Sequence, residues 1–181
     1  AHPTEDWLRK AVMHFSDDTI AAVGGPATTP ASDSFMAIMG GRVYANRLVS
    51  GSYAYLSCGD SGIHIIDISD KYNPQVLHTC DTPGTAWHSA VSFSNLLIAD
   101  DSSGIRIMDI SSLPSAPVFI KNHATPGPAT GIDANGSLAV VTCGDFGLRT
   151  LDISNLNAIT ETGHTLENSR IFKVVLSGNY A

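Results

Sequence analysis

Charged residues are scarce in this chain. Only 15% of its 181 residues are charged, and 10 Lys and Arg face 17 Asp and Glu, which gives a formal net charge of −7. These few basic residues form no positively charged stripe that could bind a nucleic-acid backbone or an anionic lipid surface. We therefore expect no nucleic-acid partner. No apolar run approaches the roughly 20 residues needed to cross a bilayer, so we also expect no membrane span.

Cysteine is rare as well. The three cysteines, Cys58, Cys80 and Cys143, are too few for a disulfide framework, and we expect buried free thiols. The sequence also lacks the His-x-x-x-His and Cys-x-x-Cys spacings of metal sites and the Gly-x-Ser-x-Gly turn of serine hydrolases. We therefore assign no catalytic residue, no metal ligand and no cofactor from motifs.

What the chain does contain is an internal repeat. A similar stretch recurs at residues 59–69, 101–111 and 144–154, and in each copy Asp-Ile-Ser begins five residues after a glycine. The copies are 42 and 43 residues apart. A constant period of this length indicates one supersecondary unit stacked against copies of itself.

Within a repeat, apolar residues follow the short period of strands and not that of helices. The predicted strands fall at equivalent places in the copies: 53–58, 96–99 and 138–142, then 63–68, 105–110 and 148–153, then 75–79 and 118–121, and finally 87–91. Four short strands in roughly 42 residues are the unit of a β-propeller blade. The predicted fold is all-β, with blades of four antiparallel strands and about three and a half repeats.

Residues kept in every copy are expected to serve the fold. The turn glycines should adopt a positive φ: Gly62, Gly104 and Gly147. The aspartates that end the second strand should accept backbone N–H bonds from the next turn: Asp67, Asp109 and Asp152. Asp60 and Asp145 are expected to hydrogen-bond within their own turns. An alternative is a calcium site made from Asp60, Asp100, Asp101 and Asp145, although no EF-hand spacing is present.

The repeated unit resembles the LVIVD-repeat family. The residues that carry the resemblance are 59–69 with Pro74 and 82–84, and 101–111 with Pro114, Pro117 and 125–127. The third copy keeps 144–154 but lacks the proline turns and the Thr-Pro-Gly. The resemblance covers about residues 42–181 and implies a β-propeller without implying an activity. It also implies an extracellular or cell-surface location, because such repeats often occur in proteins predicted to be exported.

Both ends of the chain depart from the repeat. Residues 1–41 combine a predicted helix over 6–15 with a Gly-, Pro-, Ser- and Thr-rich loop over 24–34. This segment either packs on the propeller or supplies a closing strand; the alternative is an anchoring or partner-binding arm. Residues 177–181 echo the start of an earlier repeat, so we expect further residues or another chain to complete the ring.

Positions that differ between copies are where function is expected. In an up-and-down blade the Gly-Asp-x-Gly turns and the Thr-Pro-Gly connections share one face of the disc. Asn46, His88, Gly131 and Lys173 occupy one register position of the predicted innermost strands. The predicted binding residues at this channel mouth are Asn46, Trp87, His88, His123 and Lys173. The alternative is that these side chains only line a solvated channel.

The sequence therefore favours a non-catalytic protein-interaction or scaffold module of an exported or cell-surface protein. One alternative is a propeller enzyme with a metal-assisted site at the channel mouth, using His88, Asp101 and His123. Another is a structural subunit of a larger assembly. The expected partner is a protein, or a further chain that completes the propeller.

Overall fold

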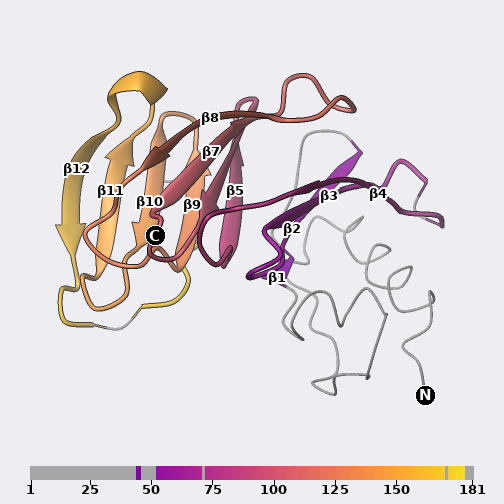
Figure 1. Cartoon of the computed structure of the whole chain (residues 1–181). Coiled ribbons are helices and arrows are strands. Elements are labelled where there is room, and N and C mark those ends of the chain that lie inside the picture. The colour runs from indigo at the N-terminus through magenta and orange to yellow at the C-terminus, as the bar shows by residue number, and fades with distance from the viewer. Residues whose placement is uncertain (1–43, 46–51, 71, 170, 178–181) are drawn as a thin grey trace, which may run out of the picture.

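Three four-stranded antiparallel sheets make up the described part of the chain (Figure 1). The computed structural model describes residues 44–45, 52–70, 72–169 and 171–177. In each sheet the strands lie side by side in chain order, as the propeller-blade prediction requires. The fold is a β-propeller repeat array, and each sheet is called a blade below.

The strand bounds repeat from blade to blade. The first blade contains β1 (Tyr44–Ala45), β2 (Tyr53–Ser57), β3 (Ile63–Asp67) and β4 (Gln75–Cys80). The second contains β5 (His88–Ser92), β6 (Asn95–Ala99), β7 (Ile105–Asp109) and β8 (Val118–His123). The third contains β9 (Gly131–Asn135), β10 (Leu138–Thr142), β11 (Leu148–Asp152) and β12 (Thr160–Thr165). A single 3-10 turn, η1 (Leu156–Ala158), is the only helical element of the described residues, and no helix there is long and apolar enough to span a membrane.

Alternation along the strands gives each blade two apolar faces. Leu96 and Ile98 of β6 pack in one cluster with Ile63 and Ile65 of the first blade. Their neighbours Leu97 and Ala99 point the other way, into a cluster with Ala139, Val141 and Leu151 of the third blade. Because successive side chains of a strand point to opposite faces, one strand serves both clusters. The core is therefore a series of layers between blades.

The Gly-Asp-x-Gly turns have the backbone that their glycines predict. Gly62, Gly104 and Gly147 adopt φ values of 71°, 76° and 74°. A Cβ at Gly104 would collide with the carbonyl oxygen of His123 on β8. The strand-ending aspartates also lie as expected, because Oδ1 of each accepts the backbone N–H two residues later at 2.8 Å: Asp67 from Ser69, Asp109 from Ser111 and Asp152 from Ser154.

The bond expected of Asp60 within its own turn is not formed. Its carboxylate accepts instead from the Thr85 hydroxyl, at 2.8 Å, on the connection to the next blade. The backbone N–H groups of Ser61 and Gly62 donate to the carbonyls of Cys58 and Gly59 and not to Asp60. Asp145 likewise forms no side-chain hydrogen bond within its turn among the described residues.

Each turn is fastened to the blade that follows. Gly59 pairs with Ala86, Asp101 with Ala129 and Gly144 with Ile171 as isolated antiparallel bridges. After the last bridge, residues 171–177 lie beside β9, where the Leu176 N–H donates to Asp133 Oδ2 at 2.7 Å. The turns and the blade connections thus share one face of the array, as predicted. The segment 1–41, with its predicted helix, and residues 178–181 lie outside the described residues.

Candidate functional site

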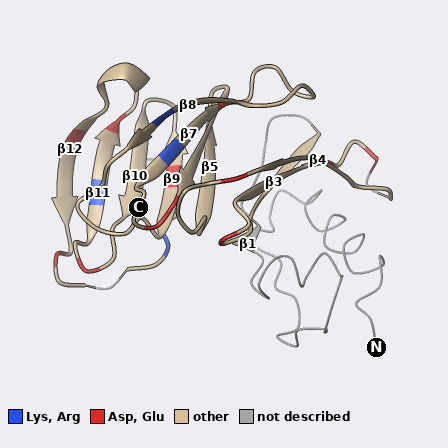
Figure 2. Ribbon diagram, in the orientation of Figure 1, with Lys and Arg blue, Asp and Glu red and all other residues tan. Residues whose placement is uncertain are grey.

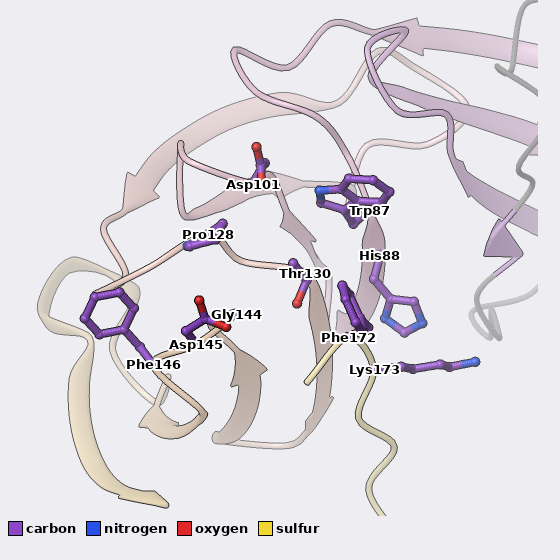
Figure 3. A pocket seen from close by; sticks show the side chains of 10 residues that line it. All are labelled: Trp87, His88, Asp101, Pro128, Thr130, Gly144, Asp145, Phe146, Phe172 and Lys173. Carbon is purple, nitrogen blue, oxygen red and sulfur yellow. The ribbon is translucent and has the colours of Figure 1, made fainter. Parts of the chain in front are cut away.

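A cavity opens on this face, between the second and third blades and residues 171–177 (Figure 3). Its volume is about 460 Å³. It is lined by residues from the turns, the connections and the starts of the inner strands: Trp87, His88, Asp101, Pro128, Thr130, Gly144, Asp145, Phe146, Phe172 and Lys173. A volume of this size lies in the range of small-ligand and side-chain pockets.

The cavity is built from positions at which the repeats differ. Trp87, Thr130 and Phe172 each follow a bridge residue, so they are equivalent. Phe146 stands where the earlier turns carry Ser61 and Ser103. Its ring fits because Gly127 has no side chain; a Cβ there would collide with it. Repeat-specific aromatic residues thus turn a common blade junction into a pocket.

His88 begins β5 and is 4% exposed. Its Nδ1 lies 2.7 Å from the carbonyl oxygen of Ile132 on β9, so Nδ1 carries the proton and donates. Burial lowers the pKa of His88, which keeps the ring neutral. The neutral ring leaves Nε2 as an acceptor, and this buried atom has no hydrogen-bond partner among the described residues.

Two carboxylates and one ammonium group border the cavity. Asp101 lies on the β6–β7 turn and Asp145 on the β10–β11 turn, and neither carboxylate has a hydrogen bond or ion pair within the described chain. Lys173 also lines the cavity, but its side chain extends away from the other lining residues, past His88 (Figure 3). The polar part of the pocket is therefore weighted toward acceptors.

The structure brings together three of the five predicted binding residues. Trp87, His88 and Lys173 all line the cavity. His123 does not line it, because it ends the outer strand β8, where it pairs with Ile105. Asn46 lies outside the described residues. Sequence reasoning missed Phe146 and Phe172, although comparison of equivalent positions could have found them.

The aspartates of the calcium alternative have separate environments. Asp60 is bonded to Thr85, and the buried Asp100 accepts the Gly84 N–H at 3.0 Å. Within the described ranges, no group of three or more His, Cys, Asp or Glu side chains lies close enough to hold a metal ion. Only Asp101 and Asp145 of the four line the cavity.

The three cysteines are free thiols. Cys58 and Cys143 are buried at equivalent places before their turns, and burial raises the pKa of Cys58 to about 12 and that of Cys143 to about 11. Thiols with such high pKa values are poor nucleophiles at neutral pH. They act as packing residues of the core clusters.

Comparison with solved structures finds similar folds at low identity. The computationally designed Ika8 protein is 15% identical, with a TM-score of 0.56 over 73% of this chain and 39% of that one. PorZ, a surface component of the type-IX secretion system of Porphyromonas gingivalis, is 18% identical, with a TM-score of 0.47 over 70% of this chain and 17% of PorZ. This chain therefore spans well under half of either protein. No curated protein matches the sequence.

The family comparison is more direct. The model of the LVIVD repeat matches three times in succession, over residues 45–82, 83–125 and 126–166. These matches cover most of the chain, and their limits coincide with the passage from one blade to the next. The chain belongs to the LVIVD repeat family.

Proposed function

We propose that this chain is a non-catalytic protein-interaction module that receives a segment of a partner protein in the cavity between its second and third blades. The observation that carries the proposal is the exposure of aromatic rings around that cavity. Phe172 is 63% exposed and Phe146 is 49% exposed. Clustered exposed apolar side chains on a folded protein typically mark an interaction site.

The energetics of interfaces support this function. Aromatic residues in a pocket bury a large area when a partner docks, and they dominate measured binding energies. The rest of the cavity adds polar groups that orient a ligand, namely the carboxylates of Asp101 and Asp145. A rigid β-framework with variable residues on one face is suited to recognition.

A metal-assisted enzyme has less support. That alternative needs His88, Asp101 and His123 in one site, and His123 lies on the outer strand and not at the cavity. His88 is also committed through Nδ1 to the carbonyl of Ile132. These placements favour binding over catalysis by that set of residues.

The proposal includes an exported or cell-surface location for the whole protein. Its support is the family resemblance noted above. Immunoblotting of culture supernatant, surface and cytoplasmic fractions of the source cells tests the location, and recovery only in the cytoplasmic fraction would contradict it.

The binding function is tested by selecting a displayed random-peptide library on the immobilised chain. Enriched peptides should bind in solution, and Phe172→Ser should weaken them about tenfold or more, because a pocket aromatic contributes on the order of 2 kcal/mol. Phe93→Ser is the matched control, because Phe93 is 74% exposed but lies on the β5–β6 turn at the opposite face.

The control variant should bind the peptides as the unaltered chain does. Failure to enrich any peptide, or equal losses in the two variants, would contradict the proposed function. Circular dichroism of both variants separates lost binding from lost folding.

A further inference from the structure

We propose that the cavity recognises a cationic side chain, lysine or arginine, presented by the partner. This inference rests on the proposed function and specifies its ligand. It comes from three features of the same cavity: unpaired acceptor atoms, aromatic walls, and an internal cation that does not fill it.

The acceptor atoms come from two blades. Asp101 and Asp145 place carboxylates without partners, among the described residues, on two neighbouring turns. His88 Nε2 is buried in the wall of the cavity, so it is not an acceptor for the ligand. A carboxylate that a docking ligand shields from water needs a donor from that ligand. Ammonium and guanidinium groups carry only donors.

The aromatic walls suit the same ligand. In Figure 3 the rings of Trp87 and Phe172 stand on one side of the cavity and the ring of Phe146 on the other. A cation over an aromatic face is attracted by the negative face of the ring, and Trp is the best partner. The second blade already uses this contact, since the Arg106 guanidinium carbon lies 4.3 Å from the centre of the Phe119 ring.

Charge complementarity excludes the other ligand classes. An anionic side chain would meet two carboxylates, and like charges brought together disfavour binding. A purely apolar side chain would remove water from Asp101 and Asp145 without replacing it. Lys173, the one cation at the cavity, extends away from the other lining residues, and Lys and Arg are few along the described ribbon (Figure 2). A net charge of −7 attracts basic partners over distance.

The test uses the full chain carrying Trp7→Phe, so that Trp87 is the only tryptophan and reports on the cavity. The probes are three blocked pentapeptides, Gly-Ser-X-Ser-Gly, in which X is arginine, its neutral isostere citrulline, or glutamate. Fluorescence titration should show the arginine peptide binding about tenfold more tightly than the citrulline peptide, because charge-assisted bonds and the cation–π contact both need the charge. Added salt should weaken only the arginine peptide.

Asp101→Asn and Asp145→Asn should each weaken the arginine peptide about fivefold, as expected for partly exposed charge pairs. Asp60→Asn is the matched control, because it alters the same kind of turn in the first blade, where the carboxylate binds Thr85 and not the cavity. Equal affinity for the citrulline peptide, no saturable response to the arginine peptide, or no loss in the two cavity variants would overturn the inference. Displayed peptides that depend on Phe172 but contain no required cation would overturn it while leaving the interaction function in place.

Discussion

At the scale of single residues, His88 shows how one position is set by its neighbours. The sequence places it at the start of an inner strand, equivalent to Gly131 and Lys173. In the structure its ring is 4% exposed and bonded across the blade boundary to Ile132. Burial lowers the pKa of His88, because desolvation disfavours the imidazolium, and this effect outweighs the opposing influence of the Ile132 carbonyl and the Asp133 carboxylate.

This gives a prediction for stability against pH. In the folded chain the pKa of His88 is lowered from its ordinary value of 6.5. As the pH falls below 6.5, the unfolded chain therefore binds a proton at His88 more readily than the folded chain does. Stability therefore falls on acidification, and His64 and His123 contribute in the same direction, because burial lowers their pKa values as well. His88→Asn keeps a donor toward Ile132 and removes the titration, so it should reduce this loss. Urea midpoints at about pH 7.5 and about pH 5.5 measure it, and an unchanged pH dependence in the variant would contradict the assignment.

At the scale of elements, the repeated hairpin turn is the most constrained piece of the chain. Gly104, at a positive φ, lets the β6–β7 turn pass beside the end of β8, and Asp101 of the same turn forms the bridge to the next blade. The same β-bulge recurs in each outer strand pair, at Ile65/Ile66, Ile107/Met108 and Thr150/Leu151. A bulge increases local twist, so the outer strand leaves the sheet in the same way in every blade.

Substitutions at two glycines distinguish the cost of a left-handed backbone from the cost of a steric collision. Gly104→Ala adds a Cβ against the His123 carbonyl at a φ of 76°, and it should cost about 3 kcal/mol or more. Gly136→Ala is the control, because Gly136 has a φ of 59° but no atom within 4 Å of its added Cβ. It should cost only about 1 kcal/mol, the penalty of the left-handed conformation. Free energies of unfolding from urea titrations test the difference, and equal costs would show that the His123 contact is unimportant.

At the scale of the whole molecule, blades hold one another through their faces. Ile107 belongs to the cluster shared by the second and third blades, and Ile65 to the cluster shared by the first and second. Since repeat arrays are stabilised by intrinsic and nearest-neighbour terms, loss of one interface should weaken its two blades together. The cavity depends on this stacking, because residues from both blades line it.

Ile107→Ala tests this stacking. Ile107 is 0% exposed, so removing its side chain should cost about 2 to 5 kcal/mol. Val118→Ala on the neighbouring strand β8 is the control, because Val118 is 59% exposed and its loss should cost about 0.5 kcal/mol or less. Thermal unfolding of both variants measures the costs. A cost of Ile107→Ala as small as that of the control would contradict the layered core.

The period of the repeat, the alternation of apolar residues and the turn glycines were sufficient to predict the blades, their strands and the face that the turns and connections share. These features are local or recur at a fixed spacing, so they can be recognised in the sequence alone. Trp87, His88 and Lys173 were identified in this way. The pairing of Asp60 with Thr85 and the position of His123 away from the cavity were decided only by the tertiary structure. These features depend on the distance between neighbouring blades and on which backbone donors are already hydrogen-bonded. Neither can be deduced from the order of the residues alone.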